Sequence, residues 1–125
     1  MTKRILIVDD EENVLITLED GLGSISDVTI TTAPGGAEAY AKLVTTPFDL
    51  IITDYKMPRM SGLQLIEFAR QLYPTVTAII LTAYRTEELE RRAEAYRVYK
   101  IFDKPAPLKE IRATINQLLH GSDSQ

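Results

Sequence analysis

The sequence predicts an α/β domain built on a five-stranded parallel sheet with helices on both faces. Three features of the 125 residues favour this class: apolar runs of strand length recur five times, three of these runs are almost continuously apolar, and segments with helical spacing separate them. Continuous apolar runs indicate strands buried on both faces, as in a parallel sheet covered by helices. Five β-then-α units with right-handed crossovers are too few for a (β/α)8 barrel, which needs eight.

The expected strands are the apolar runs themselves. In chain order they are Ile5–Val8, Val28–Ile30, Leu50–Ile52, Ala78–Leu81 and a shorter, weaker run around Val98–Phe102. The first, third and fourth runs are the nearly continuous ones, so these strands are expected to be covered on both sides.

The expected helices place apolar residues three and four positions apart, on one face of each helix. In chain order these apolar stripes are Val14, Leu15, Leu18 and Leu22; then Ala37, Tyr40 and Val44; then Leu65, Ile66, Ala69 and Leu72; then Leu89, Ala93 and Tyr96; and finally Leu108, Ile111, Ile115, Leu118 and Leu119. The last helix is the clearest, and the fourth, over Thr86 to Tyr96, is the weakest. Turn residues agree with this division: Gly21 and Gly23 close the first helix, Pro34-Gly35-Gly36 opens the second, and Ser61-Gly62 opens the third.

Length and composition narrow the function. The chain fits one domain, expected over 1–119, with the polar residues 120–125 as a tail or the start of a linker, so it is either a stand-alone domain or one cut from a longer protein. A net charge of −4 provides no basic field for nucleic acid. Without cysteine, and with His120 as the only histidine, thiolate catalysis, serine–histidine triads and histidine-rich metal sites are not expected. No membrane span or signal peptide is evident, so a soluble, cytoplasmic domain is expected.

Polar side chains follow four of the five expected strands at the point where each strand ends. Asp9 and Asp10 follow the first run, Asp54 the third, Thr82 the fourth and Lys104 the fifth. The carboxyl ends of parallel strands meet at one edge of a sheet, where α/β proteins bind ligands. The sequence therefore predicts that these five residues share one crevice.

Three carboxylates placed so closely cannot all stay ionised without counter-charge. Lys104 supplies one positive charge, and a hard divalent cation such as Mg²⁺, which prefers carboxylate oxygens and water, would supply two more. Glu11 and Glu12 are most simply first-turn helix residues that complement the helix dipole. Taken singly, each remaining residue also has a purely structural explanation: Asp10 as a helix N-cap, Asp54 as a turn residue, Thr82 as a cap of the fourth helix and Lys104 as a surface lysine.

The motifs "ILIVDDEEN", "DLIITDYKMPRMSGLQLI", "AIILTAY" and "IFDKP", in this order and spacing, resemble the receiver domain of bacterial two-component response regulators along essentially the whole chain. The resemblance implies a flavodoxin-like (βα)5 fold with strand order 2-1-3-4-5. It also implies that Asp54 accepts a phosphoryl group from a phosphohistidine. Mg²⁺ (or Mn²⁺) would bind Asp10, Asp54 and the backbone carbonyl of Lys56 directly, and Asp9 largely through water.

The same resemblance assigns the other side of the crevice. Thr82 would hydrogen-bond the phosphoryl oxygens, and Lys104 would form an ion pair with them. Pro105 would follow a cis peptide bond, for which X-Pro is the usual setting. Ile101 occupies the switch position and Tyr84 flanks the site.

Four positions depart from the common pattern of the family. Ile101 stands where an aromatic residue is usual, Arg97 replaces the usual glycine before the fifth strand, and Lys56 and Tyr84 occupy variable positions. We expect these departures to affect switching and the phosphate lifetime rather than the chemistry. Because Ile101 is β-branched and stiff at its first torsion, our hypothesis is that it rotates little on activation and that the 82–86 loop carries the change.

The leading interpretation is a phospho-accepting signalling switch that relays its change to the surface of the last helices and strand. It is not a turnover enzyme, although it assists its own phosphorylation and dephosphorylation. The expected partner is a sensor histidine kinase or phosphotransfer protein, with a homodimer through the fourth and fifth helices as one option and no direct contact with nucleic acid or membrane. The alternatives are a pseudo-receiver that only binds partners, an aspartyl-nucleophile phosphatase, disfavoured because Lys56 stands where such enzymes carry a second acid, and a flavodoxin relative.

Overall fold

The computed structural model describes residues 2–121, and a sheet of five parallel strands lies at its centre. The strands are β1 (Lys3–Val8), β2 (Val28–Ala33), β3 (Leu50–Thr53), β4 (Thr77–Thr82) and β5 (Lys100–Asp103). Their order across the sheet is β2-β1-β3-β4-β5, which confirms the expected order. The order reverses between β1 and β3, so the carboxyl ends of these two strands border the position where open α/β sheets bind ligands.

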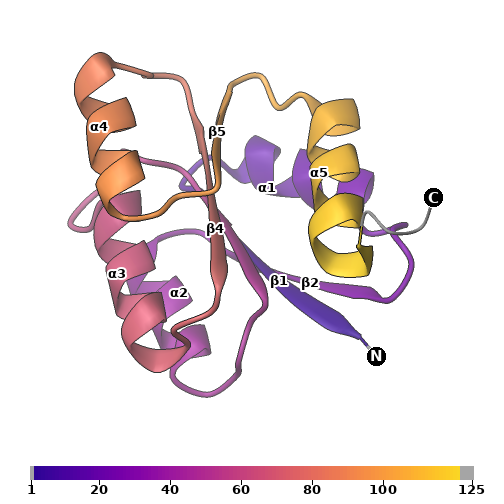
Figure 1. Ribbon diagram of the computed structural model, residues 1–125. Helices are drawn as coiled ribbons and strands as arrows, with labels where there is room; N and C mark the ends of the chain where they lie inside the picture. The colour runs from indigo at the N-terminus through magenta and orange to yellow at the C-terminus, as the bar shows by residue number, and fades with distance from the viewer. Residues whose placement is uncertain (1, 122–125) are drawn as a thin grey trace.

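In the part of the chain that the structure describes, five helices cover the two faces of the sheet, as predicted. They are α1 (Glu12–Leu22), α2 (Gly36–Leu43), α3 (Gly62–Leu72), α4 (Glu87–Ala95) and α5 (Leu108–His120). Helices α1 and α5 lie on one side of the sheet, and α2, α3 and α4 lie on the other (Figure 1).

The side chains of β1 show how this cover buries the sheet on both faces. Ile5 and Ile7 pack into the core beneath α1 and α5, whereas Leu6 and Val8 pack into the core beneath α2 and α3. All four side chains have 1% exposure or less. Strand residues that point to either side are therefore equally apolar, which is why the run lacks the alternation of a half-exposed strand.

The orientation of α2 differs from the prediction. Its buried residues are Gly36, Ala39 and Leu43, whereas Tyr40 and Val44, from the stripe assigned to the core, are 41% and 49% exposed. The physical reason is that this short helix has apolar residues on both sides, so periodicity alone does not identify the side that faces the sheet.

The fifth strand begins two residues later than expected. The amide of Val98 donates to the carbonyl of Ala93 and closes α4; the amide of Tyr99 donates to the Ala78 carbonyl of β4, and the paired register begins at Lys100. Arg97, which stands at the usual glycine position, has a φ of 57°, in the left-handed region that glycine adopts most easily.

The last helix continues through His120, one residue into the segment that the sequence assigns to a tail. The His120 ring nitrogen Nε2 lies 2.7 Å from the carbonyl oxygen of Ser26, beside the start of β2. Residues 122–125, the rest of the predicted tail, lie outside the described residues.

Candidate functional site

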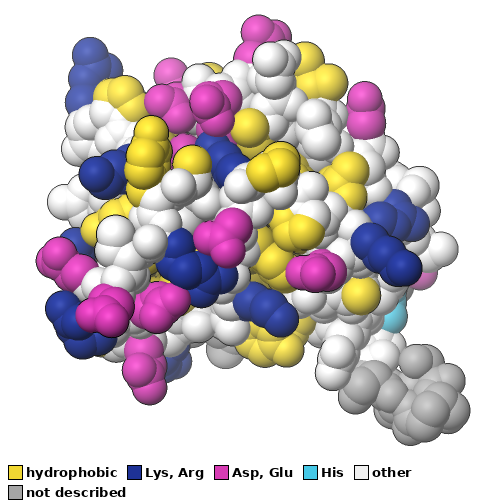
Figure 2. Space-filling model, turned by 90° about the horizontal axis from the view of Figure 1, so that it is seen from above, with side chains coloured by type: hydrophobic (Ala, Val, Ile, Leu, Met, Phe, Trp, Pro, Cys, Tyr) yellow, Lys and Arg dark blue, Asp and Glu magenta, His cyan; other side chains and the backbone are white. Residues whose placement is uncertain are grey.

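The strand register places the predicted site residues side by side at the carboxyl edge of the sheet. Val8 pairs with Thr53 in neighbouring strands, so Asp9 and Asp54, each the next residue along its strand, emerge together. The amide of Asp54 extends this ladder by donating to the carbonyl of Val8 at 2.9 Å. Seen from above, acidic side chains gather at this edge close to a recessed basic side chain (Figure 2).

The ammonium group of Lys104 lies at the centre of the site. Its Nζ is 2.9 Å from Asp9 Oδ2, 3.2 Å from Asp54 Oδ2 and 2.9 Å from Glu11 Oε1. Asp9, Asp54 and Lys104 therefore meet as the sequence predicted. Asp9 and Asp54 are buried, with 1% and 7% exposure, whereas the Glu11 side chain is largely exposed.

Glu11 has a different role from the one expected. It is the N-cap residue of α1, but its side chain makes no capping hydrogen bond and reaches Lys104 instead. Sequence reasoning missed this contact because the two residues are 93 positions apart. The signal available in the sequence was that acidic residues outnumber basic ones at this edge. Lys104 is therefore a counter-charge for a fourth carboxylate, that of Glu11, in addition to the three predicted ones.

Burial and the neighbouring charges together shift the pKa values of the site residues. Burial raises the pKa of both Asp9 and Asp54 above the ordinary carboxyl value, and the hydrogen bonds and charge of Lys104 only partly oppose this shift. Burial alone lowers the pKa of Lys104, but its hydrogen bonds with Glu11 and Asp9 and the charges of Asp9 and Asp54 outweigh burial and raise it. The ammonium is thus well compensated, while the carboxylates remain short of positive charge.

Asp10 completes a group of donors that fits a divalent cation. One carboxylate oxygen from each of Asp9, Asp10 and Asp54 lies within 4.8 Å of the others. Asp10 is exposed, which leaves its side of the group open to water. An all-oxygen donor set of carboxylates and water suits Mg²⁺, and the added charge offsets the shortage described above.

Thr82 and Tyr84 border the site on the β4 side. Thr82 is fully buried, and its Oγ1 accepts a hydrogen bond from the backbone amide of Tyr84 at 3.1 Å. The Tyr84 ring is 63% exposed, and the Lys56 Nζ lies 5.5 Å from the ring centroid, within the range of a cation–π contact. On the β5 side, the peptide bond between Lys104 and Pro105 is cis, which confirms that prediction.

Ile101 lies apart from the acids, at the surface of the core beneath α3 and α4. It is half-buried, and its backbone carbonyl accepts a hydrogen bond from Arg85 Nη2 at 2.7 Å. Arg85 also contacts Asp103 at 3.1 Å and Glu90 at 3.2 Å. A single guanidinium therefore links the loop after β4 to both β5 and α4. Sequence reasoning missed Arg85, since nothing in the local pattern identifies its partners.

Gly62, the first residue of α3, permits a close approach that positions Asp54. Its amide donates to the carbonyl of Tyr55 at 2.8 Å, and a side-chain Cβ at this position would lie 2.2 Å from the Asp54 carbonyl oxygen. Ser61, the N-cap, forms a reciprocal pair of hydrogen bonds with Gln64 that fixes the start of the helix. Ser61 thus fixes the start of the helix, and Gly62 leaves room for the Asp54 carbonyl.

Comparison with known proteins identifies the family. The model of the response regulator receiver domain matches residues 5–116. The chain belongs to this family. It is 30% identical over 117 residues to the response regulator receiver protein CpdR of Brucella abortus, covering 94% of this chain and 97% of CpdR. It is also 31% identical over 114 residues to the probable chemotaxis protein CheY of Rhizobium etli, covering 90% and 88% of the two chains.

Solved receiver structures have the same fold. The signal receiver domain of an HD domain-containing protein from Pseudomonas fluorescens Pf-5 superposes with a TM-score of 0.89, at 28% identity and full coverage of both chains. The chemotaxis protein CheY4 of Vibrio cholerae gives 0.86 at 26% identity, covering 95% of this chain and all of that one. The chain spans a smaller part of other relatives, 51% of the regulator PhoP of Bacillus subtilis and 25% of PilR of Pseudomonas aeruginosa.

Membership of the family supports the leading interpretation of the sequence. Receiver domains are phospho-accepting switches of two-component systems, they interact with histidine kinases or phosphotransfer proteins, and they typically use Mg²⁺. The phosphatase and flavodoxin alternatives are thereby set aside. Within residues 2–121, no helix combines the length and apolar content needed to cross a membrane.

Proposed function

We propose that Asp54 is the phosphoacceptor of this receiver domain. The observation that carries the proposal is the position of its carboxylate, nearly buried and 3.2 Å from Lys104 at the reversal point of the sheet. In the transfer, an Asp54 oxygen forms a bond to phosphorus as the P–N bond of the donor phosphohistidine breaks, and the bonding electrons leave with the imidazole. Burial favours this nucleophile because fewer waters must be displaced from it before the phosphorus approaches.

The metal set proposed for this transfer is Asp9, Asp10, Asp54 and the backbone carbonyl of Lys56. The grouping of three acids supports it, with Asp10 on the open side. When bound, Mg²⁺ supplies positive charge that stabilises the equatorial oxygens of the transferring group. The tight hold of Lys104 and the backbone amide of Glu11 on Asp9 fits the expectation that Asp9 acts largely through water.

Lys104 and Thr82 are the proposed phosphoryl-binding residues. Lys104 is already at the site, where its Nζ lies 3.2 Å from Asp54 Oδ2. Thr82 Oγ1 accepts a hydrogen bond from the backbone amide of Tyr84, and its hydroxyl hydrogen would donate to a phosphoryl oxygen once Thr82 moves toward it. The proposed signal is therefore a movement of the 82–86 loop, which contacts α4 and β5 through Arg85.

The remaining parts of the proposal concern the surroundings of the domain. The domain assists the hydrolysis of its own acyl phosphate, since the same charges that stabilise transfer to Asp54 also stabilise attack by water. Self-association through the outer face of α4 and α5 is one route to output, and Tyr99, half exposed before β5, supports an apolar contact there. The proposed setting is the cytoplasm. The net charge of −4 gives no support for direct binding to nucleic acid or an anionic membrane.

Labelling with a small phosphodonor tests the assignment. Incubation with acetyl phosphate and Mg²⁺ should add one phosphoryl group, detected by intact-protein mass spectrometry. Asp54→Asn keeps the size but removes the nucleophile and should abolish labelling, while Asp10→Asn should raise the Mg²⁺ concentration required. Asp20→Asn, an exposed acid on α1, is the matched control. Equal labelling of Asp54→Asn and wild type would refute the assignment, and no labelling of wild type would favour the pseudo-receiver.

A further inference from the structure

Four large apolar side chains are exposed on the outer surface of α2, its C-cap and α3, and none of them belongs to the phosphoacceptor site. Tyr40 and Val44 are 41% and 49% exposed, and Phe68 and Leu72 are 38% and 43% exposed. The rings of Tyr40 and Phe68 meet with centroids 5.0 Å apart and an interplanar angle of 56°. This tilted contact joins the two helices into one surface, which we call the α2–α3 apolar patch.

The patch repeats at helical spacing, which separates it from scattered surface residues. Tyr40 of α2 and Val44, the C-cap residue of that helix, are four positions apart, and Phe68 and Leu72 are four positions apart on α3. The other large exposed apolar residues, Ile16, Tyr84 and Tyr99, are distant from one another along the chain. Two parallel apolar lines on adjacent helices form the kind of contiguous surface that marks an interaction site.

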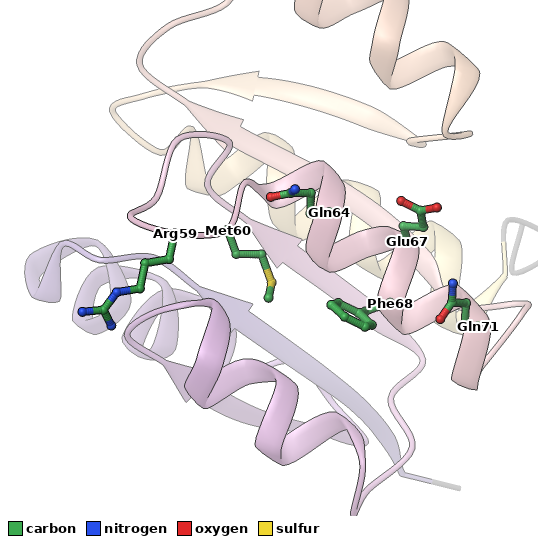
Figure 3. Close-up of a pocket in the computed structure, with 6 residues that line it drawn as sticks. All are labelled: Arg59, Met60, Gln64, Glu67, Phe68 and Gln71. Carbon is green, nitrogen blue, oxygen red and sulfur yellow. The ribbon is translucent and has the colours of Figure 1, made fainter.

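A hollow of about 320 Å³ adjoins the patch. It is lined by Arg59, Met60, Gln64, Glu67, Phe68 and Gln71. Met60 and Phe68 lie on the side of α3 that faces α2, while Gln64, Glu67 and Gln71 lie along α3 (Figure 3). Apolar side chains therefore line the hollow on the side toward α2, and two amides and one carboxylate line it along α3.

The area of the patch indicates its occupant. A large apolar side chain has roughly 200 Å² of surface, so the observed exposures leave roughly 300 Å² across the four residues. A standard dimer interface buries roughly 800 Å² from each partner, of which a little over half, roughly 450 Å², is apolar, so this patch alone is smaller than a stable dimer needs. A single amphipathic helix, which inserts a few apolar residues at i, i+3, i+4 and i+7 between two helices, fits it.

The charges around the hollow agree with a protein helix. Arg59 stands at one end, in the loop before α3, and Glu67 stands further along α3. Opposite charges at separate points favour a partner segment that carries both signs. They disfavour nucleic acid and anionic lipid, which require clustered basic residues.

We propose that the α2–α3 apolar patch docks an amphipathic helix of another protein. The helix lies along the hollow with its apolar side chains against Tyr40 and Phe68, an acidic residue near Arg59 and a basic residue near Glu67. This surface is separate from the phosphoacceptor edge, and binding there does not require that Asp54 be phosphorylated.

The test uses the full 125-residue chain and a displayed library of short amphipathic helices with Leu, Ile or Phe at i, i+3, i+4 and i+7. Selected peptides, labelled with fluorescein, are titrated by fluorescence anisotropy against wild type, Val44→Lys and Leu72→Lys. Both residues are close to half exposed, and thermal melts check that the variants fold. We expect each lysine to weaken binding by about tenfold or more.

Two further proteins make the result specific. Ile16→Lys introduces the same charge at a residue 50% exposed on α1, on the opposite side of the sheet, and should bind like wild type. Asp54→Asn should also bind like wild type, so the proposal stands or falls separately from the phosphoacceptor assignment. Failure to enrich any binder, or binders insensitive to Val44→Lys and Leu72→Lys, would overturn it. The proposal would also be overturned if analytical ultracentrifugation showed that the wild-type chain is a dimer and that Val44→Lys dissociates it. The occupant of the patch would then be a second copy of this chain.

Discussion

Replacing Gly62 with alanine perturbs the site through the backbone alone. The new Cβ would stand 2.2 Å from the Asp54 carbonyl oxygen and 3.1 Å from Thr53 Cγ2. Since such contacts require at least about 3.0 Å, the start of α3 or the loop after β3 must move by nearly 1 Å. The same carbonyl accepts the Thr53 hydroxyl at 2.9 Å, and the Gly62 amide donates to the Tyr55 carbonyl at 2.8 Å, so neither side moves without straining a hydrogen bond.

The expected cost follows from this overlap. Overpacking of this kind costs roughly 1–3 kcal/mol, and the better helix propensity of alanine returns at most about 1 kcal/mol. Gly36→Ala is the matched control because Gly36 is also the first residue of a helix. Its Cβ would lie 2.9 Å from both Cβ and Sδ of Met60, so the thioether must rotate and the loop that carries Met60 must yield slightly, a much smaller shift than Gly62→Ala requires. We expect Gly36→Ala to change stability by less than about 1 kcal/mol.

Two measurements check the reasoning. Urea denaturation followed by circular dichroism should place Gly62→Ala below both wild type and Gly36→Ala. Labelling with acetyl phosphate should also slow by at least about tenfold in Gly62→Ala, because the displaced carbonyl belongs to the phosphoacceptor, and small misplacements of reacting groups reduce rates strongly. If Gly62→Ala matches Gly36→Ala in both stability and labelling, the close approach at Gly62 does not position Asp54.

Three further predictions concern charge and motion. Because burial raises the pKa of Asp54 and Asp9, protonation favours the folded state, and this stability is lost as pH rises through the raised values. With EDTA present, Asp54→Asn should therefore raise the melting temperature at neutral pH and less near pH 4, and a lower melting temperature at neutral pH would contradict this. Arg85→Ala should speed amide hydrogen exchange in the 82–86 loop while costing under about 1 kcal/mol, since the side chain is partly exposed; unchanged exchange would show that Arg85 does not restrain the loop. Structures with and without beryllofluoride and Mg²⁺ should show the 82–86 loop moved and the Ile101 rotamer retained; a large Ile101 swing with an unmoved loop would refute this.

The sequence predicted the fold and most of the site because both depend on local patterns. Continuous apolar runs identified the strands, and one polar residue after each of four strands was enough to place Asp54, Thr82 and Lys104 at one edge. Periodicity did not determine the buried side of α2, since eight residues with apolar groups on both sides fit either orientation. The contacts of Glu11 and Arg85 also escaped, because their partners are fixed by the packing of distant strands.

The crowding of acids at this edge also indicates which contact of Lys104 is released first. If Asp54 is phosphorylated as proposed, the phosphoryl group adds negative charge to a site that also holds the carboxylates of Asp9, Asp10 and Glu11 against one ammonium. Lys104 must then give up one of its partners. Asp9 is 2% exposed at its side chain, and leaving it unpaired incurs the large penalty of a buried, uncompensated charge. Glu11 is 63% exposed, so water replaces the ammonium there at a cost of about 1 kcal/mol or less. In the proposed switch Lys104 would therefore retain Asp9 and leave Glu11, so the exposed acid at the start of α1 would hold the lysine in the resting site without opposing its movement to the phosphoryl group.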